Sequence, residues 1–569
     1  MGALTVKRIL YVAAFGAFFV ILGGYFGWYG FEYITMRKIH KDLSLDNDTK
    51  GFTNWKNLPV LIKFSMYLFN VTNPEEIQLG GKPILQETGP YVFEIQKSRT
   101  NISWWPDGTI QYYDKSIYRY AQDTDVQNSL DEEITLLNVG LLGAAILVER
   151  IFPFGLSLVN EAIPLLFPNS TDMFIRATVR EILFDGVMIQ CNYTSGSAMP
   201  ICNGLKAKAP PTIIRDEVTK HYSFAMLRHK NNTLSGPYRV NTGSKNVSEL
   251  GKIVEVKNKM YIPFWDKNTT CSEIKGTDST IFPPLTEPKN DIYIYVPDVC
   301  ISMSASFVNK SYLDSKITAY HYESSKNNFA SVEEWPENKC KCSKLEDSHK
   351  EPFCYKRGAF EAFDCQGSPI VFSPPHFLDA DPSYLNYVEG LKPDREKHLT
   401  YVSIEPLTGV PISGRKRIQM NMFLKKIKGI TLLTNVTEGL FPIGWAEEGA
   451  DLHSGGITEL AKLYYLLETF KVIRWILIIL GVILMVIALL LYLKMKHLLC
   501  FHNNQVTAEF EYGVNQWRAK EGEPQKLSTF NTDKVSGVED APQTISTIYP
   551  PLGNKGDVPT SITSTTVPR

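Results

Sequence analysis

The sequence carries little net charge and has no block of basic residues. Its 59 lysine and arginine residues nearly balance 60 aspartate and glutamate residues, which leaves a formal net charge of −1. A nucleic-acid-binding surface needs clustered basic side chains to neutralise phosphates, commonly with aromatic side chains between them. We therefore expect no nucleic-acid partner.

The common catalytic motifs are also missing. The chain has no Gly-x-Ser-x-Gly elbow, no His-Glu-x-x-His zinc motif, no Walker loop and no dinucleotide-binding glycine pattern. His376 lies near Asp379 and Asp381, which suggests a metal or acid–base role. Carboxylates that cap the turn at Asp381-Pro382 explain the same spacing better. We expect no enzymatic activity, no metal and no cofactor.

Two long uncharged apolar runs lie near the chain ends, at 9–31 and 475–493. Each has about the 20 residues that a helix needs to cross a bilayer. The alternative for the first run is a cleaved signal peptide, but the run is too long and ends in aromatic rather than small residues. We expect two transmembrane helices, with short cytosolic residues 1–8 before them and a cytosolic tail, 494–569, after them.

The glycosylation acceptors, Asn-x-Ser/Thr, occur only between the two apolar runs. Because glycosylation requires passage through a secretory lumen, residues 32–474 are expected to form a glycosylated extracellular domain. Basic residues flank both sides of the runs, so the positive-inside rule alone does not decide the orientation, and the acceptors do. We expect a two-pass protein of the cell membrane with both termini cytosolic. The acceptors are Asn47, Asn70, Asn101, Asn169, Asn192, Asn231, Asn246, Asn268, Asn309 and Asn435.

Eight of the 9 cysteines lie between the apolar runs, where an oxidising compartment favours disulfides. Cys191 and Cys202 form a local loop, whereas Cys340 and Cys342 are too close in sequence to bond comfortably to each other. The alternative is a zinc site, which the absence of paired Cys-x-x-Cys motifs disfavours. Its ligands would be Cys340, Cys342, Cys354 and Cys365.

Alternating apolar and polar residues predict an antiparallel sheet. Residues 62–68 and 418–425 alternate with the period of two that is typical of half-buried strands. Proline and glycine between the predicted strands favour loops over crossover helices. Further strands are predicted at 291–296, 317–323 and 401–405.

Two neighbouring segments lack this alternation. Residues 134–148 and 156–167 are apolar almost throughout and are interrupted at Pro153 and Pro164, so we expect helices. They are too short to be a third membrane span. The residues alone favour a buried helical hairpin over the alternative, an apolar cap above a ligand entrance.

Several sequence blocks resemble the class B scavenger receptor family. They occur in the same order over nearly the whole chain up to the second apolar run. The blocks are Glu87-Thr-Gly-Pro-Tyr91, Gly276-Thr-Asp-Ser-Thr-Ile-Phe-Pro-Pro284, Pro375-His-Phe-Leu-Asp-Ala-Asp-Pro382, Glu405-Pro-Leu-Thr-Gly409 and Arg417-Ile-Gln-Met-Asn421. Within the family, Met173-Phe-Ile-Arg176, Glu181-Ile-Leu-Phe-Asp-Gly-Val187 and the pair Cys191 and Cys202 resemble the insect sensory neuron membrane protein branch.

The resemblance implies an α+β fold, in which two transmembrane helices flank one large extracellular domain. That domain would have an antiparallel β-barrel core, helical insertions, a membrane-distal helical cap and an apolar tunnel. Residues 134–167 would then form the cap, which reverses the interpretation as a buried hairpin. The disulfides implied by the resemblance are Cys271 with Cys340, Cys300 with Cys365, Cys342 with Cys354, and Cys191 with Cys202.

The function implied by the resemblance is a non-catalytic chemosensory receptor or co-receptor. It would bind apolar odorants such as lipid-derived pheromones and pass them through the tunnel toward the membrane or an odorant receptor channel. Odorant receptor channel subunits and odorant-carrier proteins would be partners. The alternative is a scavenger or lipid-uptake receptor for lipoproteins and fatty acids. Seven acidic and three basic side chains over 131–182 disfavour polyanionic cargo. The ligand-binding residues are not identified by the sequence.

Two features bear on other contacts. Gly23 and Gly27 have the spacing that permits close helix packing, either with the second span or with another protein. The tail from 503 to 569 is rich in Thr, Ser and Pro, so we expect it to be disordered and cytosolic. Cys500, just after the second run, is either an acylated or a free thiol.

Overall fold

A computed structural model describes residues 2–121, 128–168, 171–193, 195–313, 317–343, 353–496 and 498. The chain divides into two units, Met1–Leu499 and Cys500–Arg569. The second unit is outside the described residues. The predictions for Asn169, Cys500 and the cytosolic tail therefore fall on parts of the chain that the structure does not describe.

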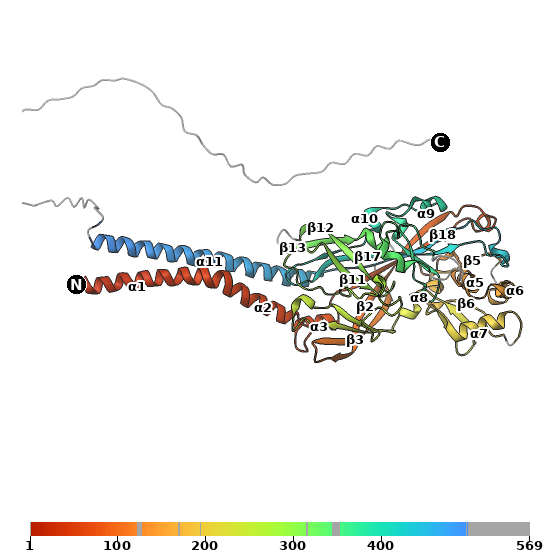
Figure 1. Ribbon diagram of the computed structural model, residues 1–569, viewed down its shortest axis with the longest axis horizontal. Helices are drawn as coiled ribbons and strands as arrows, with labels where there is room; N and C mark the ends of the chain where they lie inside the picture. Colours follow the sequence, from red (N-terminus) through yellow and green to blue (C-terminus); the bar gives the residue numbers. More distant parts are fainter. Residues whose placement is uncertain are drawn as a thin grey trace, which may run out of the picture. The chain divides into compact units, whose positions relative to one another are not determined.

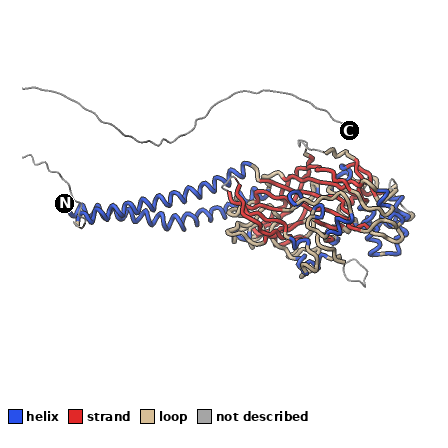
Figure 2. The backbone as a smooth tube through the Cα atoms, turned by 90° about the horizontal axis from the view of Figure 1, so that it is seen from above, coloured by secondary structure: helices blue, strands red, loops and turns tan. Residues whose placement is uncertain are grey.

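Both apolar runs are helical. α1 (Gly2–Ile21) continues through a π-helical segment, Leu22–Gly30, into α2 (Phe31–Leu43), and α11 spans Ser454–Met495. Figures 1 and 2 show the two long helices side by side, leaving the same end of the domain. Both are long and apolar enough to cross a membrane.

Glycines allow the two long helices to pack closely. A Cβ atom added to Gly16 would lie 2.8 Å from the carbonyl oxygen of Gly481, and one added to Gly23 would lie 3.0 Å from that of Arg474. Small residues at such contacts let helix backbones approach each other. The sequence left open whether Gly23 and Gly27 pack against the second span or against another protein. In the structure they pack against α11, which contains the second span.

Replacing Gly481 by leucine is expected to separate the two helices, because the new side chain would occupy the space of α1. The separation can be measured by replacing Trp28 and Trp475, whose ring centroids are 5.4 Å apart, with cysteines and oxidising them to a disulfide. The cross-linking yield is expected to be several-fold lower with Gly481→Leu than without it. Gly24→Leu is the matched control, because a Cβ there meets no atom within 4 Å. Equal yields in both variants would contradict the glycine contact.

The domain is built on one antiparallel, 13-stranded sheet that is nearly closed into a barrel. The main strand order is β10-β9-β3-β2-β1-β18-β17-β16-β13-β12-β11, while β15 pairs with β14 and β17. The strands are β1 (Ile62–Val71), β2 (Leu85–Trp104), β3 (Thr109–Tyr120), β9 (Leu234–Asn241), β10 (Ile253–Val256), β11 (Asp291–Val296), β12 (Ile301–Leu313), β13 (Ile317–Ser324), β14 (Phe360–Glu361), β15 (Ile370–Ser373), β16 (Tyr401–Ile404), β17 (Pro411–Leu424) and β18 (Gly439–Asp451).

One short segment joins the two ends of this strand order. The carbonyl of Gly276 accepts a hydrogen bond from Ile253 of β10, and Thr277 pairs with Ile294 of β11. Gly276 has a positive φ of 79° and lies against the backbone of Tyr293, which a side chain would prevent. The segment leaves fewer unpaired backbone groups at the sheet edges.

Smaller elements decorate the sheet. Two further sheets pair β4 (Glu133–Leu137) with β5 (Phe174–Thr178), and β8 (Tyr222–Phe224) with both β6 (Val187–Ile189) and β7 (Ile213–Arg215). The other α-helices are α3 (Lys50–Lys56), α4 (Pro74–Gln78), α5 (Val139–Ile151), α6 (Leu156–Leu166), α7 (Ala198–Lys208), α8 (Phe363–Gln366), α9 (Pro382–Tyr387) and α10 (Arg395–His398).

The predicted strands are confirmed as β1, β11, β13, β16 and β17, but two details differ. The helix predicted over 134–148 begins only at Val139, because the residues before it form β4 and pair with β5. A short buried strand and a helix cannot be told apart by apolar content alone. In β17, the polar residues Gln419 and Asn421 are 0% exposed. Their amides bond to neighbouring segments, so both faces of that strand are covered.

Candidate functional site

The apolar hairpin α5–α6 lies at the end of the domain opposite the long helices (Figure 1). α5 begins after Asn138, whose side-chain oxygen accepts the Leu141 N–H at 3.0 Å. The chain then turns through a single 3₁₀ turn, Pro153–Gly155, before α6. Proline cannot continue the first helix, so the sequence itself produces the hairpin.

One face of the hairpin belongs to the core of the domain. Leu142, Ala145 and Ala162 are fully buried in a cluster that also contains Met422 of β17 and Phe441 of β18. The hairpin is thus continuous with the sheet through apolar contacts, as expected when burial of nonpolar area drives packing.

Two ion pairs fasten the hairpin to the sheet. The Arg150 Nη1 atom lies 3.0 Å from Oε1 of Glu361 in β14, and the Lys425 Nζ atom lies 2.6 Å from Oε2 of Glu149. Glu361 is only 4% exposed, so a buried charge would be left without compensation if Arg150 were lost. The pairs orient α5 over the sheet.

The turn of the hairpin carries an exposed apolar patch, which we call the tip. Ile151, Phe152 and Phe154 are 65%, 60% and 90% exposed. Large apolar side chains gathered on a surface commonly mark a binding site for a ligand, partner or membrane. The tip is therefore a candidate contact site for apolar molecules.

The segment that contains the hairpin, 131–182, has seven acidic and three basic side chains. Within the described part of 131–182, the three basic side chains are all paired with carboxylates: Arg150 with Glu361, Arg176 with Asp172 and Arg180 with Asp131. Their positive charge is therefore compensated inside the protein. This surface suits uncharged ligands better than polyanionic ones.

Four disulfides join the same cysteine pairs that the resemblance implies: Cys191–Cys202, Cys271–Cys340, Cys300–Cys365 and Cys342–Cys354. The zinc alternative is therefore wrong, because all four proposed ligands are engaged in disulfides. Cys191 and Cys202 also belong to the core cluster of the α5–α6 hairpin. This bridge therefore links α7 to the segment after β6, next to the hairpin.

Inside the sheet, five charged side chains form a cluster that the sequence analysis missed. The Asp298 carboxylate lies 2.9 Å from Lys416 Nζ and 2.6 Å from Lys230 Nζ. Lys416 also contacts Glu448, and Lys97 lies 3.9 Å from Glu448. We call these residues the interior charge cluster. The sequence signal that could have indicated this cluster is a charged residue at an inward-facing position of an alternating strand, as at Lys97, Lys416 and Glu448.

The strand register places this cluster on the inner face. Glu448 is opposite both Lys416 and Phe64, and Phe64 belongs to an interior apolar cluster. Burial alone would lower the pKa of Lys416, but Asp298 and Glu448 outweigh burial and raise it. Burial would raise the pKa of Asp298, but Lys230 and Lys416 hold it well below its ordinary value. The charges therefore depend on one another.

A second charged group lies deeper in the same interior. Arg99 is 2% exposed, and its Nη2 atom lies 2.6 Å from Oδ2 of Asp278. Burial opposes ionisation of Asp278, but Arg99 outweighs it and lowers the pKa to about 2. Burial raises the pKa of Asp114, whose carboxylate lies 3.6 Å from Arg99 Nε. The interior of the barrel is therefore not uniformly apolar.

His376 binds a carboxylate rather than a metal. Its Nε2 atom lies 2.5 Å from Glu87, which also accepts the Trp445 N–H at 2.7 Å. The His376 ring stacks on His398 with centroids 4.3 Å apart. No group of side chains suited to a metal occurs among the described residues.

The two aspartates near His376 have structural roles. Asp381 accepts the Ser383 N–H at 2.9 Å and caps α9, so the predicted turn-capping role is confirmed. Asp379 instead lies 2.8 Å from the Arg395 guanidinium. Among the described residues, the hydrogen-bond partners of His376 are instead Glu87, Gln419 and Lys392.

Most of the described glycosylation acceptors are exposed. Two are half-buried: the Asn70 side chain accepts the Thr135 N–H at 2.8 Å, and the Asn231 side chain accepts the Tyr118 N–H at 3.0 Å. Their side chains already stabilise the fold. The exposed acceptors are Asn47, Asn101, Asn192, Asn246, Asn268, Asn309 and Asn435.

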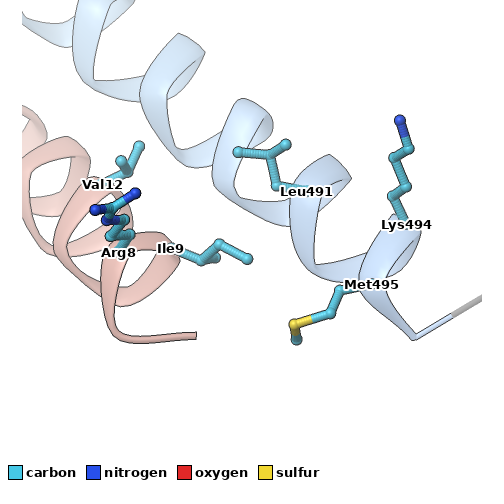
Figure 3. Close-up of a pocket in the computed structure, with 6 residues that line it drawn as sticks. All are labelled: Arg8, Ile9, Val12, Leu491, Lys494 and Met495. Carbon is cyan, nitrogen blue, oxygen red and sulfur yellow. The ribbon is translucent and has the colours of Figure 1, made fainter. Parts of the chain in front are cut away.

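A pocket of about 400 Å³ lies between the ends of α1 and α11 (Figure 3). It is lined by Arg8, Ile9, Val12, Leu491, Lys494 and Met495. This pocket belongs to the long helices rather than to the domain. The tunnel through the domain therefore stays a prediction.

Comparisons with known proteins agree with this architecture. The CD36 family model matches residues 14–492. The chain is 35% identical over 508 residues to "Sensory neuron membrane protein 2" of Heliothis virescens, covering 89% of this chain and 97% of that protein. It is 36% identical over 502 residues to the protein of that name in Manduca sexta, covering 87% and 96%. It is 33% identical over 462 residues to "Sensory neuron membrane protein 1" of Apis mellifera, covering 81% and 86%.

The family match extends from the first apolar helix to the second and includes the whole sheet. The comparisons confirm the resemblance that the sequence blocks indicated, both to the class B scavenger receptors and to the sensory neuron membrane proteins. The chain therefore belongs to the CD36 family.

Proposed function

We propose that this chain is a non-catalytic membrane receptor for apolar odorants such as lipid-derived pheromones. It takes them up at the tip and passes them through the extracellular domain toward the membrane or an odorant receptor channel. The observation that carries this proposal is the exposed tip on a hairpin whose other face lies in the domain core. The names of its relatives, which are sensory neuron membrane proteins, support a sensory role.

The physical need for such a receptor follows from the ligand. An aliphatic molecule gains about 0.8 kcal/mol for each methylene group removed from water, so it leaves an apolar carrier slowly. In the proposed route, the ligand would move from the exposed apolar tip past the core into the interior of the sheet. The interior charge cluster would then meet the ligand and favour ligands that have a polar end group.

Replacing Phe154 by serine is expected to weaken the binding of a long-chain aliphatic pheromone about tenfold, since full burial of such a side chain contributes about 1.5–3 kcal/mol. Displacement of a fluorescent fatty acid from the full chain in detergent measures this affinity. Met260→Ser is the matched control, because Met260 is apolar and 77% exposed but lies outside the hairpin.

Two outcomes would contradict the proposal. Equal affinity loss in the Phe154 and Met260 variants would show that the tip is not the contact site. Lipoprotein uptake by cells that express the chain, without sensitisation of a co-expressed odorant receptor, would favour the alternative of a scavenger or lipid-uptake receptor. Sensitisation by the parent chain but not by Phe154→Ser is the expected result.

A further inference from the structure

The pocket between the ends of α1 and α11 has an almost entirely apolar lining, and two cationic residues border it with their charged ends pointing away from the space (Figure 3). Figure 3 shows side chains of both helices around the space, with Ile9 and Met495 extending into it. Val12 and Leu491 complete the apolar wall, and Arg8 and Lys494 are the charged residues. Its volume of about 400 Å³ falls in the range of about 300–1,000 Å³ that is usual for small-molecule sites.

The packing of the helices explains why the pocket opens where it does. Gly16 and Gly481 hold the backbones in contact. Between this contact and the helix ends, the facing residues are larger, including Val12, Leu491 and Met495. Large side chains keep helices farther apart than glycine does. The space is therefore a consequence of the sequence of both helices.

The basic residues at this end have no acidic neighbour in the adjoining sequence. Lys7 adjoins Arg8, and Lys496 follows Lys494 closely. The sequence has no aspartate or glutamate from 1 to 31 or from 469 to 508. Cations at the edge of a membrane-spanning segment attract anionic lipid head groups. Charge complementarity thus identifies the class of ligand.

We propose that this pocket binds one anionic phospholipid. Its acyl chains lie against Ile9, Val12 and Leu491, and the Arg8 guanidinium and the Lys494 ammonium turn toward the mouth of the pocket and donate hydrogen bonds to its phosphate. A guanidinium suits phosphate because it presents several N–H groups in one plane. The site requires the two helices to lie in a membrane, and it is independent of odorant binding at the tip.

Native mass spectrometry of the full chain, extracted from vesicles of equal parts phosphatidylserine and phosphatidylcholine, tests the site. The parent is expected to retain phosphatidylserine in preference to phosphatidylcholine. The double variant Arg8→Gln with Lys494→Gln is expected to lose about 30-fold in phosphatidylserine affinity, since each cation contributes about fivefold. The matched control is Lys7→Gln with Lys496→Gln, which removes the same charge from residues that do not line the pocket.

The control pair is expected to retain most of the phosphatidylserine. Equal losses in the two double variants would overturn the site, because they would indicate a general attraction to basic residues. Equal retention of both lipids by the parent would also overturn it. Leu491→Trp provides an independent check, because it fills the pocket without changing the charge. This variant is expected to release phosphatidylserine, and unchanged retention would contradict binding in the pocket.

Discussion

Replacing Lys416 by methionine is expected to destabilise the domain by about 1.5 kcal/mol, because the change leaves two carboxylates inside the sheet without their shared cation. In the parent, Lys416 Nζ lies 2.9 Å from Asp298 and also contacts Glu448. The Asp298 and Glu448 side chains are 29% and 23% exposed, and each keeps a second lysine, so the loss is smaller than for a fully buried ion pair. Chemical denaturation followed by fluorescence measures the loss.

Two controls show whether the effect comes from the interior charge cluster. Lys63→Met makes the same chemical change on an exposed side chain of β1 and is expected to alter stability by less than about 0.5 kcal/mol. Combining Lys416→Met with Asp298→Asn is expected to cost less than the sum of the single changes, because the two residues interact. Strict additivity would show that Lys416 and Asp298 are not coupled.

Lowering the pH from 6.5 to about 4 is expected to destabilise the domain through His398 by about 3 kcal/mol. His398 is 5% exposed, and its Nδ1 atom accepts the Asp394 N–H at 2.9 Å. Burial, assisted by neighbouring His376, lowers its pKa from 6.5 to about 4. The neutral ring is therefore the form that suits the folded protein.

The sign of this effect follows from the depressed pKa. Because the unfolded chain binds the proton more readily, the stabilisation is fully present above pH 6.5 and is lost as the pH falls toward 4. Asp278 acts in a lower window, because its pKa is lowered from 3.8 to about 2. A decline confined to pH values below 4 would therefore contradict the role of His398.

Unfolding curves of two glutamine variants at several pH values separate the contributions. His398→Gln is expected to flatten the decline between pH 6.5 and 4. His229, whose pKa is also lowered to about 4 by burial and by Lys230, should supply the slope that remains. His453→Gln, at an exposed position, should leave the profile unchanged. An unchanged profile in His398→Gln would contradict the assignment.

The sequence alone predicted the helices and strands whose formation depends on the residue pattern of a single short segment. The two long apolar helices, β1 and β11 are predictable because hydrophobic length and period-two alternation are properties of a single segment. The break at Pro153 is predictable for the same reason. The family and its implied disulfide pairs came from ordered sequence blocks rather than from any one of these patterns.

Tertiary structure alone decided what depends on residues distant in sequence. The sequence around Leu136 is compatible with a helix or a strand, and pairing with β5 makes it a strand. In the interior charge cluster, Lys97, Lys230 and Asp298 lie next to residues of strands from the far end of the chain. A residue pattern within one segment does not predict such contacts. The physical reason is that a segment's own sequence shows which of its side chains are apolar, but only the complete fold brings the surfaces together that bury them. A charged side chain is stable inside the protein only where the fold places a partner of opposite charge beside it.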